Sequence, residues 1–298
     1  VATLIGNTFV RNHAGGDGVA NTPYAGTPQA MAILPDGKFL LGGQLTTWSQ
    51  NTVDVQMAVV RYSPDGVIDT SEASREIAER VREELDYVRE AGHARLYHVF
   101  LSHFHWDHIM GFPFFIPVFD KGATIVIHTG HVDAEEALRR QQEEISFPVP
   151  FDWLAADISF RKLEVGQQYE IGRVTVELIA QHHSHTSFGY RFTDAVGKSI
   201  VYSTDSEHKL ERIDDEAAFA HFFSGSDLVI CDTMYSLADS VTMKEDWGHS
   251  SNIVAVDLCH QAKARRLALF HHEPSYSDAD IRRMHLESIR YEELTRDD

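Results

Sequence analysis

The stretch His103-Phe104-His105-Trp106-Asp107-His108 follows, after Ser102, on Leu96–Leu101, an apolar run that predicts a buried strand. Three imidazoles and one carboxylate therefore gather at a strand end. Because side chains alternate along an extended chain, the first two histidines point the same way. A turn beginning at the tryptophan would bring the aspartate and the last histidine to a neighbouring point. Nitrogen and oxygen donors in this pattern predict a site for divalent metal ions, with room for two.

One short segment cannot complete the ligand shells of two metal ions, so further ligands are expected at other strand ends. The sequence offers three such places: His182, His183 and His185 after a predicted strand at 174–180, Asp205 after one at 199–203, and His271 and His272 after one at 267–270. A pair of histidines at one strand end is often an ordinary polar loop. Four clusters at four strand ends favour a shared metal centre.

The rest of the chain divides into two compositional regions. Residues 1–70 are rich in Gly, Thr, Asn and Pro, and their Pro-Asp-Gly turns at 35–37 and 64–66 separate apolar runs, which predicts β-hairpins. From residue 71 on, apolar spacing predicts helices that alternate with strands. The expected helices lie at 71–91, 133–142, 252–262 and 278–294, and the expected strands at 96–101, 123–128, 174–180, 189–193, 199–203, 227–231 and 267–270. This pattern predicts an α/β sandwich at 71–298, with a β-rich segment at 1–70 that packs on it or completes it.

The composition of the chain limits which partners and which cellular compartment are expected. The chain has 26 Lys and Arg against 45 Asp and Glu, a formal net charge of −19, which argues against a long nucleic acid as partner and for a small substrate. No apolar run approaches the roughly 18 residues of a membrane span, and the first residues lack the pattern of a signal peptide. The two cysteines, Cys231 and Cys259, are interpreted as reduced core thiols, so we expect a cytoplasmic protein.

These segments together resemble the metallo-β-lactamase superfamily, whose fold is an αββα sandwich, from about residue 71 to the end of the chain. Its phosphodiesterase branch, which includes cyclic-nucleotide phosphodiesterases and the tRNA 3′-processing endonuclease, is similar at four places. These are Ser187–Phe192, Tyr202–Asp205, Gly248–Ser250 and Phe270–Pro274. The N-terminal region is atypical for the superfamily: residues 34–70 resemble one unit of a β-propeller-like repeat, which cannot bury its own face alone.

The resemblance implies a ligand set for two metal ions. His103, His105 and His183 would hold the first ion, Asp107, His108 and His271 the second, and Asp205 would bridge both. His183 is preferred to His182 because it stands five residues before Phe188, and His271 to His272 because it directly ends its strand; both choices among neighbours stay open. The all-imidazole first site suits zinc, with manganese or iron as alternatives.

The resemblance also implies a reaction. A metal-bridging hydroxide would attack a small phosphodiester such as a cyclic nucleotide, with Asp107 counted among the catalytic residues and His249 protonating the departing alkoxide. Asp232 and Glu245 are candidates to orient His249, and Asp69 is a candidate to support the metal histidines.

Two other functions remain open at this point. The same metals could serve a hydrolase of lactones, thioesters or other carbonyl compounds, although attack on a carbonyl does not require the extra acid. Alternatively, the metals could merely hold the fold of a non-catalytic protein whose N-terminal segment binds a partner. A homo-oligomer is compatible with each reading.

Overall fold

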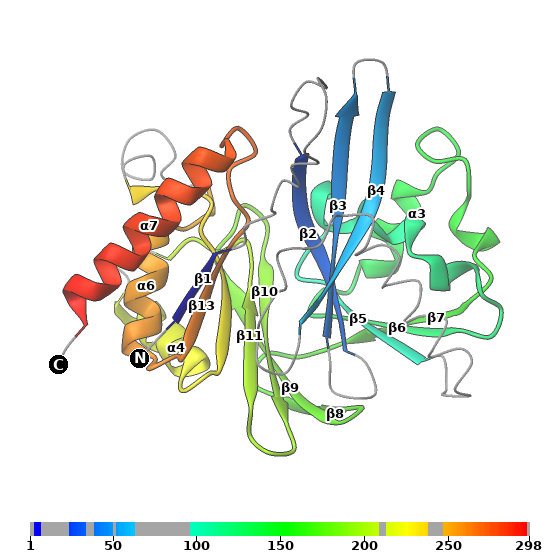
Figure 1. Ribbon diagram of the computed structural model, residues 1–298. Coiled ribbons are helices and arrows are strands. Elements are labelled where there is room, and N and C mark those ends of the chain that lie inside the picture. The colour runs from blue at the N-terminus through cyan, green and yellow to red at the C-terminus, as the bar shows by residue number, and fades with distance from the viewer. Residues whose placement is uncertain are drawn as a thin grey trace. The chain divides into compact units, whose positions relative to one another are not determined.

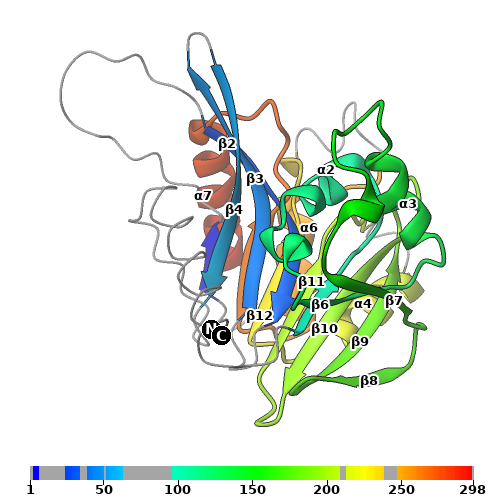
Figure 2. The ribbon, with the colours of Figure 1, turned by 90° about the vertical axis from the view of Figure 1, so that its right-hand side faces the viewer.

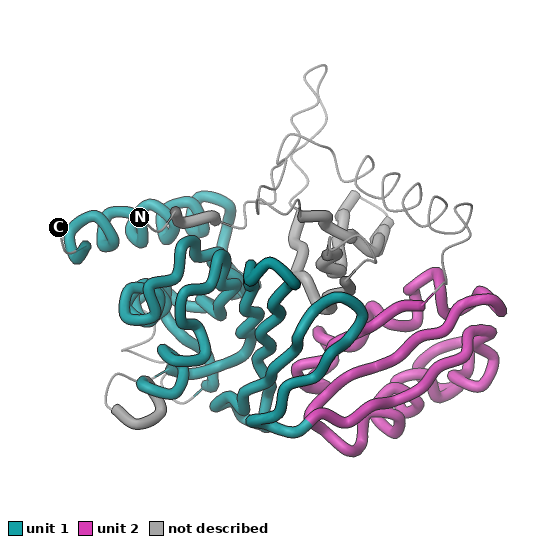
Figure 3. The backbone as a smooth tube through the Cα atoms, turned by 90° about the horizontal axis from the view of Figure 1, so that it is seen from below, with its two compact units in different colours: residues 1–8, 164–298 teal, residues 9–163 magenta. Residues whose placement is uncertain are grey.

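The computed structural model describes residues 3–6, 24–33, 39–49, 52–62, 96–208, 213–237 and 247–296. The chain forms two compact units: unit 1 comprises residues 1–8 and 164–298, and unit 2 comprises residues 9–163 (Figure 3). Each unit contains one β-sheet. The helix expected at 71–91, the candidate supporting residues Asp69 and Glu245, and the expected domain boundary at residue 70 lie outside the described residues.

The sheet of unit 1 has seven strands in the order β1-β13-β12-β11-β10-β9-β8 (Figure 1). The strands are β1 (Thr3–Gly6), β8 (Gln168–Ile171), β9 (Val174–Gln181), β10 (Ser187–Asp194), β11 (Ser199–Ser203), β12 (Leu228–Asp232) and β13 (Arg266–Phe270). From β1 to β11 the neighbours run parallel, and from β11 to β8 they run antiparallel. The hairpin expected around 194–198 is confirmed, with β10 and β11 as its arms. The parallel strands therefore present their carboxyl ends side by side.

Helices α4 (Ile213–Phe223), α6 (Asn252–Gln261) and α7 (Asp278–Thr295) pack on one face of this sheet (Figures 1 and 2). The core beneath them combines alternate residues of β11 to β13 with apolar residues of α4 and α6. Cys231 and Cys259 are both buried in this core as free thiols. Helix α7 begins with a capping box in which Ser277 and Asp280 satisfy one another's backbone amides, and this fixes the start of the helix.

The sheet of unit 2 has six strands in the order β4-β3-β2-β5-β6-β7. They are β2 (Tyr24–Ile33), β3 (Phe39–Ser49), β4 (Thr52–Tyr62), β5 (Leu96–Phe100), β6 (Thr124–Thr129) and β7 (Asp157–Lys162). Strands β2 to β4 form an antiparallel meander, and β5 to β7 run parallel. β2 joins the two parts by pairing with β5, Met31 opposite Phe100 and Ala32 opposite Val99.

Two helices lie on one face of the unit 2 sheet, α2 (Trp106–Ile109) and α3 (Ala134–Gln141) (Figure 2). Period-2 alternation along β5 and β6 buries apolar side chains beneath them. The helix expected at 133–142 is present as α3, with Asp133 at the N-cap position but without a side-chain capping hydrogen bond. Within the described residues, no helix is long and apolar enough to span a membrane.

Candidate metal centre

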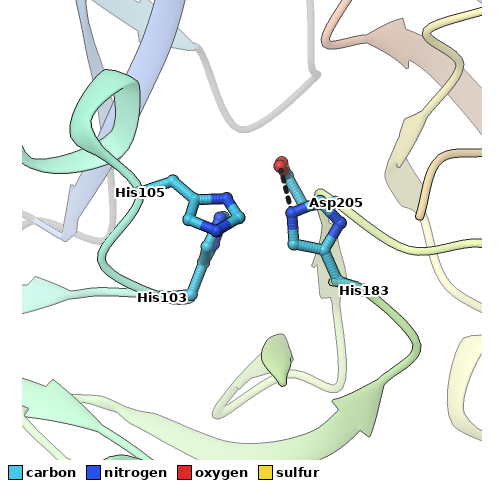
Figure 4. A group of neighbouring side chains, drawn as sticks. All are labelled: His103, His105, His183 and Asp205. Atoms are coloured by element: carbon cyan, nitrogen blue, oxygen red, sulfur yellow. Dashed lines mark ion pairs between the residues drawn. The ribbon is translucent and has the colours of Figure 1, made fainter. Parts of the chain in front are cut away.

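The N-terminal ligand cluster, which we define as His103, His105, Asp107 and His108, begins where the chain leaves β5 in unit 2. His103 is fully buried, and its Nδ1 lies 3.1 Å from the hydroxyl of Ser102. Its ring centroid is 4.4 Å from that of His105 and 4.3 Å from that of His108. Figure 4 shows the rings of His103 and His105 beside each other. Three imidazoles of unit 2 therefore converge.

The turn expected at Trp106 is confirmed, because α2 begins there. The backbone amide of His108 donates to the carbonyl oxygen of His105 at 2.9 Å, which closes the first turn. This turn buries His108, while the Asp107 side chain stays 50% exposed with its Oδ2 at 3.3 Å from His108 Nε2. The Asp107 carboxylate and the His108 imidazole, on successive residues, therefore lie close to each other.

The C-terminal ligand cluster, His183, Asp205 and His271, lies in unit 1. Asp205 is 2% exposed and stands between the two histidines. Its Oδ2 lies 3.5 Å from His183 Nε2, a pair drawn as the dashed line in Figure 4, and its Oδ1 lies 3.3 Å from His271 Nε2. One carboxylate therefore faces a different imidazole with each oxygen.

Backbone conformation helps to explain how Asp205 and His271 meet. Both follow parallel strands, β11 and β13, and both have positive φ, 52° and 58°. A non-glycine residue in this region carries conformational strain, and such strain concentrates at functional sites. The left-handed conformation of each residue ends the extended strand and changes the direction of the chain at the carboxyl edge of the sheet.

A buried network of hydrogen bonds holds the segment that carries Asp205. Gln181, which is 4% exposed, donates from Nε2 to the hydroxyl of Ser187 and to the carbonyl oxygen of Thr204, and its Oε1 accepts from Ser203. Thr204 in turn donates to Asp205 Oδ1 at 2.6 Å. Sequence reasoning missed Gln181; its position as the last residue of β9 carries no local signal of this role.

His183 is oriented by a backbone contact from far along the chain. Its Nδ1 lies 2.8 Å from the carbonyl oxygen of Gly248. Because a carbonyl oxygen only accepts, Nδ1 carries the hydrogen, and Nε2 keeps its lone pair on the side of Asp205. Burial lowers the pKa of His183, while the carboxylate of Asp205 opposes that shift. A neutral imidazole with an unprotonated Nε2 is the form that binds a metal ion.

His249 and Asp232 form a second pair in unit 1. His249 Nδ1 donates to Asp232 Oδ2 at 2.7 Å, and the carboxylate, fully buried, also accepts from the amides of Ser206 and Met234. The expectation that Asp232 orients His249 is thus matched by a direct contact. The His249 ring stacks on that of His271, with 5.0 Å between centroids.

The neighbours that were weighed as alternative ligands, His182 and His272, do not belong to the groups of converging donor atoms found among the described residues. His182 turns its ring toward Phe219 of α4, with 6.3 Å between centroids. Burial lowers the pKa of His272 to about 4. His183 and His271 each have a ring nitrogen within 3.5 Å of Asp205; the choice among neighbouring histidines as ligands stays a prediction.

The donor chemistry of these residues fits divalent metal ions. Within unit 1, one ligand atom from each of Asp205, Asp232, His249 and His271 lies within 4.8 Å of the others. Buried imidazoles and carboxylates are the ligands that zinc and related transition metals take in proteins. Each cluster by itself offers too few donors for two complete shells, as the sequence had indicated.

Comparison with known proteins agrees with this chemistry. Residues 67–272, more than half of the chain, match the family described as the beta-lactamase superfamily domain. Among curated proteins, the ribonuclease Z of Picrophilus torridus is 21% identical over 231 residues, covering 61% of this chain and 71% of its own.

Solved structures share the fold at low sequence identity. The metallo-β-lactamase fold protein YhfI from Bacillus subtilis is 16% identical with a TM-score of 0.51, covering 87% of this chain and 93% of its own. Unliganded yeast PDE1 is 12% identical with a TM-score of 0.53, covering 89% of this chain and 94% of its own. The short form of human tRNase Z is 15% identical with a TM-score of 0.50, covering 83% of this chain and 92% of its own. The expected metallo-β-lactamase fold is therefore confirmed. The chain belongs to the beta-lactamase superfamily domain family, and it is a hydrolase of the metallo-β-lactamase fold.

Proposed function

We propose that this hydrolase is a dinuclear metal phosphodiesterase acting on a small phosphodiester such as a cyclic nucleotide. The observation that carries the proposal is the placement of Asp205 between two imidazoles, with Oδ2 toward His183 and Oδ1 toward His271. A carboxylate that presents its two oxygens to different imidazoles is suited to bridge two cations. A site for a single cation would not need the second oxygen.

The proposed ligand sets follow the two clusters. In this assignment His103, His105 and His183 would hold one ion, Asp107, His108 and His271 would hold the other, and Asp205 would belong to both. The imidazole-rich set favours zinc, and manganese or iron are the alternatives to test. Divalent ions in such a pair supply activation of water and neutralisation of charge on the phosphoryl oxygens.

The protein's own contribution to the reaction is the placement of a proton. His249 carries its Nδ1 hydrogen toward Asp232, so its Nε2 is the atom that can give a proton to a departing alkoxide. The ring lies against His271, at 5.0 Å, and near His183, at 4.9 Å between centroids. The proton donor thus sits beside two proposed metal ligands, where the leaving group of a bound phosphodiester would be.

Charge and relatives support the substrate class. The relatives named ribonuclease Z, tRNase Z and PDE1 support phosphodiester chemistry. The net charge of −19 favours a small ester over RNA, because an acidic surface repels a polyanion.

The test is to strip the protein with a chelator, reload it with zinc, manganese or iron, and measure metal content and turnover. We expect two ions per chain, and hydrolysis of bis-p-nitrophenyl phosphate and of a cyclic nucleotide. Asp205→Asn should lower the metal content, and Asp227→Asn serves as the matched control because Asp227 pairs with Arg265 at the other end of β12. Turnover of a lactone alone, or a wild-type protein that binds a single ion, would contradict the proposal.

A further inference from the structure

Two tryptophans adjacent to the candidate catalytic residues are largely exposed to solvent. Trp106 is 70% exposed and Trp247 is 59% exposed. Exposure alone does not distinguish them, since Trp153 on η3 (Phe151–Trp153) is 71% exposed, and single surface apolar residues are common. What distinguishes the first two is their place in the chain: Trp106 lies between two proposed metal ligands, and Trp247 stands two residues before His249, the proposed proton donor.

Trp106 stands between two proposed ligands, His105 and Asp107, at the first position of α2. The helix buries His108 and Ile109 and leaves Trp106 and Asp107 exposed. The indole and the ligand carboxylate are therefore successive side chains on the open side of one short helix. A tryptophan contributes nothing to the core from this position.

Trp247 occupies the matching place in unit 1. The next residue, Gly248, has φ of +84° and gives its carbonyl oxygen to His183, and the residue after that is His249. The contact between Gly248 and His183 anchors the backbone directly after Trp247, which stands two residues before the proposed proton donor.

We propose that Trp106 and Trp247, each within its own unit, are stacking positions for a planar aromatic group that the substrate carries close to its scissile phosphodiester. The inference rests on the proposed function and specifies its substrate class: an ester of a nucleoside or of an aryl alcohol. An indole offers a flat, uncharged face on which a nucleobase or aryl ring stacks, and stacking tolerates any base. On a protein of net charge −19, stacking supplies binding energy without the cationic side chains that a nucleotide site would otherwise use.

The first experiment compares the kinetics of W106A, W106F and W247A with those of W153A, the matched control for loss of an exposed indole. Three esters are used: 2′,3′-cyclic AMP, bis-p-nitrophenyl phosphate, and the cyclic phosphate of ribose without a base. For W106A and W247A we expect kcat/KM for cyclic AMP to fall roughly 10- to 100-fold, mainly through KM, and to fall much less for the base-free ester. W106F should recover part of the loss, and W153A should behave as wild type.

The pattern of losses identifies the source of the aromatic group. A loss on cyclic AMP alone assigns a nucleobase, a loss on the nitrophenyl ester alone assigns an aryl group, and a loss on both assigns any planar ring. Equal losses on the aromatic and base-free esters, or none on either, would overturn the inference while leaving a phosphodiesterase in place. Absence of wild-type turnover on all three esters would instead defeat the proposed function.

A binding measurement keeps the inference testable without turnover. Titration of the metal-loaded protein with AMP should quench tryptophan fluorescence, whereas ribose 5-phosphate should quench it weakly. The quenching should diminish in W106A and W247A and persist in W153A. Equal quenching by the two ligands, or undiminished quenching in both variants, would count against stacking.

Discussion

The carbonyl oxygen of Gly248 lies 2.8 Å from Nδ1 of His183, so a backbone group fixes the tautomer of a proposed metal ligand. Two features make glycine necessary there. The φ of +84° disfavours a side chain, and a Cβ at this position would lie 2.5 Å from His183 Nδ1. The position therefore couples the segment that carries His249 to the turn that carries His183.

The first prediction follows from that contact. Gly248→Ala should displace the His183 ring or the 247–249 backbone, and we expect a loss of metal affinity together with at least a tenfold loss of kcat, by analogy with the loss of other groups that orient metal ligands. Metal titration and steady-state kinetics measure the two effects.

The matched control for that substitution is Gly197→Ala. Gly197 has the same φ of +84°, but nothing lies within 4 Å of the Cβ it would gain. It should lose stability through backbone strain alone and keep its metal affinity. Equal metal affinity in the two variants would show that the Gly248 contact does not orient His183.

The second prediction concerns His249 as proton donor. His249→Ala should reduce hydrolysis of a cyclic nucleotide, whose leaving group is an alkoxide, by roughly 10²- to 10⁴-fold. The loss on bis-p-nitrophenyl phosphate should be far smaller, because nitrophenolate departs without protonation. Comparing kcat for the two esters checks this.

Asp232→Asn provides the companion variant. Its amide can present either a donor or an acceptor to His249 Nδ1, which relaxes the choice of tautomer. We expect a smaller loss than for His249→Ala, with the same dependence on the leaving group. A loss that is equal for both esters would assign His249 and Asp232 to structural support rather than to proton transfer.

The third prediction is a loss of stability in acid. Burial, then the neighbouring His98 and Arg161, lowers the pKa of His128 to about 3, and burial lowers the pKa of His208 to about 4. The unfolded chain binds these protons near pH 6.5, so stability is complete above that pH and falls as the pH drops toward 4. Each histidine contributes a slope of up to about 1.4 kcal/mol per pH unit.

Urea unfolding between pH 7 and pH 4 measures that slope. His208 packs against Phe219 and Phe223, so His208→Phe preserves an aromatic ring and removes the titrating group. The variant should show a shallower pH dependence, whereas His185→Gln, at an exposed position, should retain the wild-type slope. An unchanged slope in His208→Phe would refute the role of His208.

The sequence predicted the framework because its signals are local. Apolar runs and turn residues located the strands that end at His103, Asp205 and His271, and apolar spacing located the last two helices. Hydrophobic periodicity and the spacing of turn residues are properties of neighbouring residues, so they can be recognised without knowledge of the fold.

The remaining features depend on contacts between distant residues. The bond between Gly248 and His183 joins positions 65 residues apart, and Gln181 supports Thr204 across 23 residues. No local pattern encodes these pairings. The positive φ of Asp205, just after β11, is likewise not indicated by apolar runs or turn residues.

The last prediction separates the charge of Asp205 from its backbone conformation. Asparagine tolerates a positive φ about as well as aspartate does, whereas alanine does not. Metal-free Asp205→Asn should therefore be as stable as wild type or more stable, because it no longer buries a carboxylate without a cation. Asp205→Ala should be less stable than Asp205→Asn, and both should bind less metal. Thermal unfolding with and without metal distinguishes these outcomes: wild type should gain the most from metal, since binding to the folded state alone raises stability. If Asp205→Asn gained as much as wild type, the carboxylate could not be the bridge between two ions.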